Sequence, residues 1–300
     1  MANMPNFLIL GAAKAGTTSL HYYLNQHPKI YMSKVKEPRF FALEGEKLNF
    51  QNPDNLINHT SITDLGEYQK LFADVSTETA IGETSPLYLY SPKAVERIKH
   101  YIPQAKLIVV LRNPVERAYS CYTHLVREGY EPLSFEAGLA AESERIANNW
   151  AHLWHYRQAG YYYQQLKRYC DYFSTEQIRV YLYEDLSQDS VSLVQNVCRF
   201  LEVEDNFVPD LTRQNVSGIP KHRVLHNLVN RGNVVRKALQ QVLPQQLRTN
   251  VAQSIREWNL QDKTPLSPMV AHQLKQQYKE DILKLQDLIQ RDLSPWLADS

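Results

Sequence analysis

The sequence predicts an α/β fold in which a central, mostly parallel sheet is flanked by helices. Two observations carry this prediction: short apolar runs alternate with helical patterns, and a glycine-bounded loop joins the first run to the first helix. Strands buried on both faces read as continuous apolar runs, and parallel strands need crossover helices between them. No repeat or low-complexity linker divides the 300 residues. We therefore expect a single domain over residues 1–300, with a core at about 6–230 and C-terminal helices at about 231–300.

The first half of the chain holds two of these units. Residues 6–10 form a short apolar run that suits a buried strand, and residues 17–26, after the glycine loop, have leucines on one helical face. A second short strand is expected over residues 79–82. Ser91 and Pro92 then begin a helix, because serine favours the cap position and proline the first turn.

The clearest strand is residues 106–111, KLIVVL, in which β-branched residues follow one another without polar alternation. Asn113 and Pro114 open the next helix. A fourth strand is expected over residues 177–183, and a helix over residues 190–201. These units complete the predicted alternation of strand and helix.

The chain becomes Gln-rich and helical from Pro244 onward. Residues 272–292 carry apolar side chains at spacings of three or four, which predicts an amphipathic helix packed on the domain, with a homodimer contact as the alternative. Residues 42–75 and 129–176 are the least regular stretches and are rich in Tyr, Trp, His and Asn. Such segments tend to form the substrate wall above an α/β sheet.

Charge and cysteine content exclude several classes of protein. Lys plus Arg number 33 and Asp plus Glu 32, a net charge of +1, which argues against binding nucleic acid through diffuse positive charge. Cys121, Cys170 and Cys198 are far apart and form no Cys-x-x-Cys pair, which favours a reducing compartment and no zinc cluster. The first residues lack the basic region of a signal peptide, and no window reaches the ~18 apolar residues of a spanning helix. We expect a cytoplasmic protein without a membrane span.

Residues 11–16, GAAKAG, have the glycine spacing of a phosphate-binding loop, but Lys14 lies inside the loop rather than after it. A strand that leads through such a loop into a helix aims backbone N–H groups and the helix dipole at one point, which suits a phosphate or sulfate. Thr17, Thr18 and Ser19 add three hydroxyl groups there. The alternative is a tight turn without a ligand.

The missing lysine after the second glycine counts against an ATP or GTP hydrolase, and no apolar strand ends in an obvious Mg²⁺-binding aspartate. Sulfonate transfer explains both absences. A sulfonate carries less negative charge than a phosphoryl group, so lysines and backbone amides can stabilise it without a divalent metal.

Two segments carry a resemblance to a known family. LILGAAKAGTTSL (residues 8–20) resembles the 5′-phosphosulfate loop of sulfotransferases that use 3′-phosphoadenosine 5′-phosphosulfate (PAPS), and KVKEPRFF (residues 34–41) resembles the Lys-Glu-x-x-Phe-Phe segment of the heparan sulfate branch. The resemblance runs from about residue 6 to residue 230. It implies a P-loop-like three-layer domain, PAPS as donor, 3′-phosphoadenosine 5′-phosphate (PAP) as product, and no metal. It assigns the 5′ end of the nucleotide to Lys14, Ala15, Gly16, Thr17, Thr18 and Ser19.

The resemblance places the 3′-phosphate after the clearest strand. Arg112 would pair with it and Ser120 would donate a hydroxyl hydrogen bond. Arg117 is interpreted as structural or as an outer charge. An ion pair at the start of the helix is the alternative for Arg112 and Ser120.

A further loop resembles the family's Lys-Gly-Arg loop, which closes over the nucleotide. Lys221 and Arg223 would add positive charge over the phosphates, while His222 stands where the family has glycine. Solvated loop charges are the alternative.

The heparan branch uses the glutamate of its Lys-Glu-x-x-Phe-Phe segment as the base, and this glutamate corresponds to Glu37. The resemblance implies an in-line transfer in which Glu37 removes the acceptor proton, Lys14 stabilises the leaving phosphate and Lys36 adds charge at the sulfonate. Flanking cations tend to keep such a carboxylate ionised. The alternative is a surface ion pair.

Glu83 and Ser85 match the family's Glu-Lys-Ser-Pro segment, except that Thr84 stands where lysine is usual. Together with Tyr88 they are expected on the acceptor side. The missing lysine weakens the case for a polyanionic glycan. The aromatic segment from Trp150 onward suits sugar stacking, a hydrophobic alcohol or core packing.

The acceptor stays open among a carbohydrate, a small-molecule or lipid alcohol and a carrier-bound hydroxyacyl chain, with a hydroxyl or an amine as the reacting group. Two other classes compete with a sulfotransferase. A nucleotide kinase-like phosphotransferase would need Mg²⁺ and a Walker lysine, and a non-catalytic protein would bind the nucleotide without transfer. The adenine is expected to stack on aromatic side chains, and the chain has 19 tyrosines.

Overall fold

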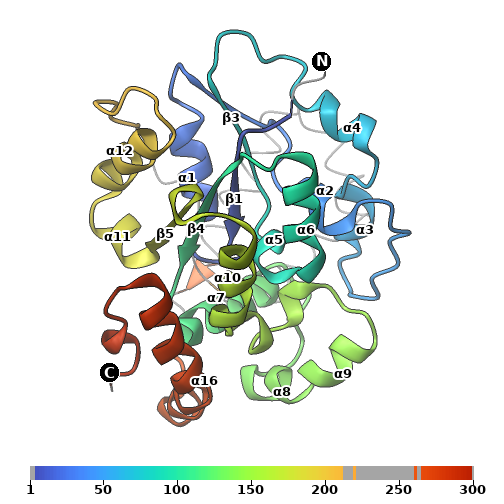
Figure 1. The fold of residues 1–300 in the computed structure, drawn as a ribbon. Coiled ribbons are helices and arrows are strands. Elements are labelled where there is room, and N and C mark those ends of the chain that lie inside the picture. The colour runs from blue at the N-terminus through green and yellow to red at the C-terminus, as the bar shows by residue number, and fades with distance from the viewer. Residues whose placement is uncertain (1–3, 212–218, 221–259, 262–264, 299–300) are drawn as a thin grey trace, which may run out of the picture.

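The computed structural model describes residues 4–211, 219–220, 260–261 and 265–298, and its centre is a parallel sheet (Figure 1). Five strands lie in the order β2-β3-β1-β4-β5, and every neighbouring pair is parallel. This sheet confirms the predicted fold class. The strands are β1 (Phe7–Gly11), β2 (Ile30–Met32), β3 (Ala80–Thr84), β4 (Lys106–Leu111) and β5 (Ile178–Leu182).

The burial and length of each strand explain which strands could be predicted from the sequence. β4 has the predicted bounds, and all its residues after Lys106 are buried, as a continuous apolar run requires. β3 begins and ends later than expected, so that Glu83 and Thr84 belong to the strand. β2 was not predicted, because three residues are too few to show a pattern. A separate antiparallel pair joins β6 (Ile219–Pro220) to β7 (Leu260–Gln261).

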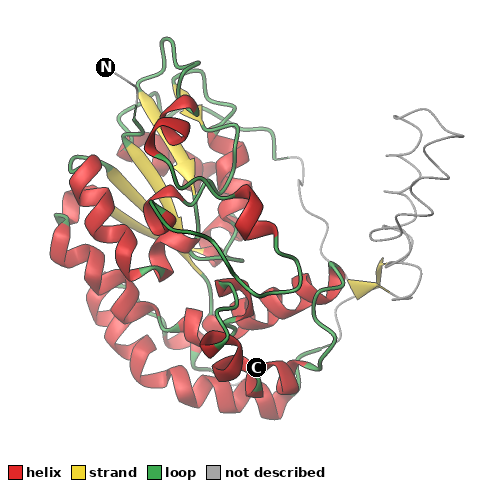
Figure 2. Ribbon diagram, turned by 90° about the vertical axis from the view of Figure 1, so that its right-hand side faces the viewer, coloured by secondary structure: helices red, strands yellow, loops and turns green. Residues whose placement is uncertain are grey.

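Helices cover both faces of the sheet and form three layers with it (Figures 1 and 2). On one face α1 contacts β1, β2, β3 and α12, while on the other α5 contacts β1, and α6 packs on α5 and α10. The longer helices are α1 (Thr17–Leu24), α6 (Pro92–Tyr101), α7 (Pro114–Arg127), α10 (Tyr162–Tyr172), α12 (Ser190–Phe200) and α16 (Pro268–Ile289). The shorter ones are α2 (Phe40–Leu43), α3 (Leu56–Thr60), α4 (Leu65–Lys70), α5 (Leu87–Tyr90), α8 (Phe135–Ala140), α9 (Glu142–Ala147) and α11 (Tyr183–Gln188).

Residues 129–176 were expected to be among the least regular stretches, but α8, α9 and the longer α10 lie within them. The buried side chains of α10 are Tyr162, Gln165, Leu166 and Tyr169, a helical spacing made of aromatic and polar residues. Helix formation there depends on packing against α6 and α16 more than on the propensity of its residues.

The C-terminal helix α16 packs on α10 and α7. Leu274, Tyr278, Ile282 and Leu285 are buried on its inner face, as the spacing predicts. The Tyr278 hydroxyl donates a 2.8 Å hydrogen bond to the Arg157 carbonyl. A homodimer contact through this helix stays a prediction.

Cys121 and Cys198 are buried, Cys170 is half-buried, and none of the three forms a disulfide. Among the described residues, no helix combines the length and the apolar character needed to cross a bilayer.

Candidate active site

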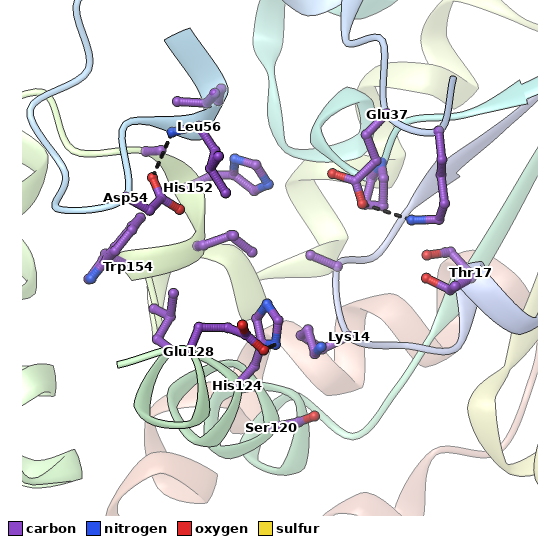
Figure 3. Close-up of a pocket in the computed structure, with 18 of the residues that line it drawn as sticks. Lys14, Thr17, Glu37, Asp54, Leu56, Ser120, His124, Glu128, His152 and Trp154 are labelled. Atoms are coloured by element: carbon purple, nitrogen blue, oxygen red, sulfur yellow. Dashed lines mark hydrogen bonds and ion pairs between the residues drawn. The ribbon is translucent and has the colours of Figure 1, made fainter. Parts of the chain in front are cut away.

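A cavity of about 680 Å³ lies where the strands end (Figure 3). The loop after β1, Arg112 after β4 and Tyr183 after β5 all line it. In open α/β sheets, ligands bind at this carboxyl edge because the strand-to-helix loops converge there. The remaining wall comes from residues 36–39, Pro86, α7 with the following Glu128, and parts of the stretches 42–75 and 129–176.

The glycine loop brings the N-terminus of α1 to the cavity. Ala12 N–H donates to the Val110 carbonyl at 2.7 Å, which fixes the loop against β4. Gly16 has a φ of 89°, and a Cβ there would lie 2.6 Å from Leu186 Cδ2, so this position requires glycine. No side chain caps the helix at Gly16. The first N–H groups of α1 lack intrahelical acceptors, and a bound anion would satisfy them.

Most of the predicted nucleotide-binding residues share this cavity. Ala15 does not line it: this loop residue is fully buried, and its N–H donates to the Ala12 carbonyl at 3.2 Å. Lys221, His222 and Arg223 lie outside the described residues. The predicted donor-site and catalytic residues that line the cavity are Lys14, Gly16, Thr17, Thr18, Ser19, Lys36, Glu37, Arg112 and Ser120.

Lys14 is a half-buried lysine in a left-handed backbone conformation, with a φ of 69°. Burial lowers the pKa of its ammonium group below 10.5. Bound negative charge would reverse this effect, since an opposite charge favours the protonated form. The site is therefore better suited to an anion than to water alone.

Glu37 faces the cavity between two cations. Its Oε1 is 2.9 Å from Lys36 Nζ, and its Oε2 is 2.7 Å from Arg39 Nη2. Burial raises the pKa of Glu37, but the charges of Lys36 and Arg39 outweigh it and bring the value to about 2. Ion pairs, the alternative interpretation of Glu37, are therefore present. The same Glu37 carboxylate lines the cavity.

The Glu37 segment is anchored to the end of β3. Glu37 N–H donates to the Thr84 carbonyl at 2.9 Å, and Arg39 N–H donates to Ser85 Oγ at 3.0 Å. Glu37 and Arg39 are both left-handed, with φ of 60° and 59°. Such backbone conformations cost about 1 kcal/mol or more and persist only where neighbours fix them. The contacts with β3 supply this restraint.

Glu83, Ser85 and Tyr88, expected on the acceptor side, are fully buried beneath this segment and do not line the cavity. Ser85 Oγ donates to Glu83 at 3.0 Å, and Tyr68 donates to the other carboxyl oxygen at 3.2 Å. The Tyr88 hydroxyl accepts a bond from Phe41 N–H at 3.4 Å. As placed, the three residues support the segment that carries Glu37.

Arg112 and Ser120 both reach the cavity from the region after β4. Arg112 pairs with Glu116 at 2.8 Å, which is the ion pair considered as the alternative, and its guanidinium lies 4.4 Å from the centre of the Tyr183 ring. Arg117, by contrast, is only 1% exposed and donates to the Tyr156 carbonyl. Its placement fits a structural role.

Sequence reasoning missed several residues of the cavity wall. Arg39 lies inside the motif KVKEPRFF, and Tyr183 ends the strand predicted over residues 177–183. Both residues could therefore have been identified from the sequence. Asp54, His124 and His152 could not, because each is a single polar residue in a segment without a recognisable pattern. Burial lowers the pKa of both histidines to about 3, so they are neutral at physiological pH. Within the described residues, no group of three or more potential metal ligands gathers.

The sequence profile of the sulfotransferase family matches residues 5–207. The chain belongs to the sulfotransferase family. The crystal structure of a sulfotransferase from Alicyclobacillus acidocaldarius is similar to this sulfotransferase, with a TM-score of 0.79 and 35% sequence identity. The similarity covers 99% of this chain and 100% of the Alicyclobacillus chain. These findings confirm the predicted family and enzyme class.

Two curated relatives are much longer proteins. The human bifunctional heparan sulfate N-deacetylase/N-sulfotransferase 3 is 31% identical over 209 residues, which is 67% of this chain and 22% of the relative. The membrane-associated sulfotransferase kil1 of Dictyostelium discoideum is 33% identical over 119 residues, 40% of this chain and 22% of the relative. The match thus spans about a fifth of each relative.

Proposed function

We propose that this sulfotransferase transfers a sulfonate group from PAPS to a hydroxyl or amine of an acceptor, without a metal ion. One observation carries the proposal. Glu37, held between Lys36 and Arg39, faces the same cavity as Lys14 and the uncapped N-terminus of α1. A base and an anion-binding loop thus line a single cavity.

The residues of the cavity fit the two ends of the nucleotide. Lys14, the N–H groups at the start of α1 and the hydroxyls of residues 17–19 would hold the 5′ end. Arg112 and Ser120 would hold the 3′-phosphate, with Arg112 exchanging Glu116 for the ligand. The loop at residues 221–223 would add charge, as the family resemblance implies. When bound, PAPS supplies a sulfonate on a good leaving group.

In the proposed reaction Glu37 takes the proton of the acceptor as the new bond to sulfur forms. Lys14 stabilises the electron pair left on the phosphate oxygen when the old sulfur–oxygen bond breaks, and Lys36 adds charge at the sulfonate. The displacement is in line and passes through no covalent enzyme intermediate. Fixed charges and backbone dipoles supply most of the stabilisation.

Two other functions are less consistent with the sequence of the loop or with the presence of Glu37 in the cavity. A nucleotide kinase-like phosphotransferase needs a lysine directly after the second glycine, where this chain has Thr17. A non-catalytic nucleotide-binding protein would bind PAP but transfer nothing. Binding of PAP in the presence of a chelator, followed by a transfer assay, separates the three.

The experiment is incubation with ³⁵S-labelled PAPS and a panel of glycans, phenols and hydroxyacyl acceptors. We expect labelled product from the unmodified protein and a loss of at least about 10²-fold in Glu37→Gln, because a general base contributes about 10² to 10⁴ in rate. PAP affinity should change by no more than a few-fold.

Glu67→Gln is the matched control, since Glu67 is an exposed glutamate paired with Lys70 outside the cavity. It should leave the rate unchanged. Full activity in Glu37→Gln would move the base elsewhere, and neither PAP binding nor transfer in the unmodified protein would refute the proposal.

A further inference from the structure

We infer that the acceptor half of the cavity selects an uncharged or cationic hydroxyl compound, such as a neutral or amino sugar, through Asp54 and His152. The inference rests on the proposed sulfonate transfer. It concerns the acceptor wall, by which we mean Asp54, Leu56, Ile57, Glu128, His152 and Trp154.

The acceptor wall lies across the cavity from the anion-binding loop. Figure 3 shows Asp54, His152 and Trp154 on the side opposite Thr17, with the Glu37 carboxylate between His152 and Thr17. A nucleotide held by the loop would therefore leave its reacting end near Glu37. The space between Glu37 and Asp54 is then left for the acceptor.

Hydrogen bonds fix Asp54 and His152 relative to each other. Asn52, only 4% exposed, accepts a 3.0 Å bond from the N–H of Ala151, the residue before His152. Its amide nitrogen donates to Asp54 Oδ1, which also accepts the N–H of Leu56 at 3.2 Å. The wall is thus a built structure rather than a chance grouping of side chains.

The acceptor wall contains two acidic residues, Asp54 and Glu128, and no lysine or arginine. Arg39 is engaged by Glu37 at 2.7 Å, and Arg127 by Glu128 at 3.0 Å. Within the described residues, Asp54 has no ion-pair partner, and burial raises its pKa above 3.8. The remaining cations of the cavity, Lys14, Lys36 and Arg112, lie with the proposed donor site.

His152 adds a polar group without adding charge. Its side chain lines the cavity and points toward Glu37 in Figure 3, while the residue is only 7% exposed. Its buried Nδ1 has no hydrogen-bond partner among the residues described. A neutral imidazole in this position can hydrogen-bond a hydroxyl group of the acceptor beside the base.

These observations oppose an anionic acceptor. A carboxylate or sulfate on the acceptor would face Asp54, while the nearby Arg39 and Arg127 are engaged by Glu37 and Glu128. A hydroxyl or ammonium group would instead donate to Asp54. The wall therefore discriminates by repulsion as well as by attraction.

The test compares three oligosaccharides of equal length as sulfonate acceptors: a chitosan hexamer at mildly acidic pH, an N-acetylated chitin hexamer and a polyuronate hexamer. We expect the chitosan and chitin probes to be labelled at least tenfold faster than the polyuronate. Asp54→Asn should reduce the advantage of the chitosan probe over the polyuronate, and Asp54→Lys should favour the polyuronate. Asp74→Asn, which changes an exposed aspartate outside the cavity, is the control and should keep the original order.

His152 is tested by splitting kcat from KM. His152→Phe should raise the acceptor KM at least tenfold while PAP affinity holds, and His152→Gln, which keeps polar groups, should recover part of the loss. An unchanged KM in His152→Phe, or an equal loss in both variants, overturns the role of His152.

Measuring PAP binding by calorimetry distinguishes a failure of the acceptor inference from a failure of the proposed sulfonate transfer. A protein that binds PAP but labels the polyuronate as fast as the other probes, or labels none of the three, overturns the acceptor inference and leaves the donor site standing. Failure to bind PAP overturns both.

Discussion

Lys14 shows at the scale of a single residue how burial prepares an anion site. Its pKa is lowered by burial, and a bound phosphate would raise it again, so binding should be accompanied by proton uptake once the pH approaches the lowered value. We expect PAP affinity to fall as the pH rises through the pKa of free Lys14, below 10.5. Calorimetry in buffers of different ionisation enthalpy measures this uptake.

Lys14→Arg is the control for that measurement, because an arginine stays charged throughout the range. Its PAP affinity should be lower but should lose the dependence on pH. The same pH dependence in both proteins would assign the titration to another group.

Glu83 is a buried carboxyl group whose protonation should affect stability. Burial raises its pKa from 4.5 to about 7, so the folded state holds the proton more tightly than the unfolded state. Its contribution to stability is full below pH 4.5 and is lost as the pH rises through 7. At about 1.4 kcal/mol per pH unit, this amounts to about 3 kcal/mol.

Glu83→Gln cannot titrate and retains polar groups for Ser85 and Tyr68. We expect the free energy of unfolding of the native protein, relative to this variant, to fall between pH 5 and pH 8 in denaturant titrations. A constant difference across that range would show that Glu83 is ionised in the folded state.

At the scale of elements, buried polar contacts hold the segment between α7 and α10 in place. Glu131 accepts bonds from Arg145 at 2.6 and 2.9 Å and from the Tyr156 hydroxyl at 2.6 Å. Glu142 accepts the N–H groups of Arg157 and Gln158 at 2.9 and 2.7 Å. This segment contains His152 and Trp154, so its order affects the order of the acceptor wall.

Glu131→Ala should destabilise the protein by about 3–5 kcal/mol, because it leaves the buried guanidinium of Arg145 unpaired. Glu131→Gln should lose less, since the amide keeps a hydrogen bond. Glu144→Ala, on the exposed side of α9, should fall within about 0.5 kcal/mol of the native protein in the same unfolding experiment. Equal losses at Glu131 and Glu144 would contradict the network.

The same elements show what could be predicted from sequence. β4, the glycine loop and the start of α7 follow from local patterns, because apolar runs, glycine spacing and an Asn-Pro cap act within a few residues. The acceptor wall depends on bonds such as the one between Asn52 and Ala151, which are 99 residues apart. No local pattern encodes such a contact, so Asp54 and His152 could not be predicted.

At the scale of the whole molecule, a near-neutral net charge does not exclude a local anion-binding site. The net charge of +1 coexists with a cavity that Lys14, Lys36, Arg39, Arg112 and Arg127 all line. Anion binding here depends on where the fold brings cations together. The net charge of the chain does not determine the charge around a single site.

The bond between Asn52 and Ala151 also has a consequence for the order of folding. Closing a chain segment of 99 residues costs more entropy than forming the turns and helix ends on either side, so this contact should form late. We expect pulse-labelled hydrogen exchange during refolding to protect the amides of α7, whose hydrogen bonds are local, before that of Ala151. Simultaneous protection would show that the wall belongs to the folding nucleus. Helix formation alone would then leave the acceptor side of the cavity unformed, because both the pairing of Phe7 with Lys106 in the sheet and the bond to Ala151 join distant parts of the chain.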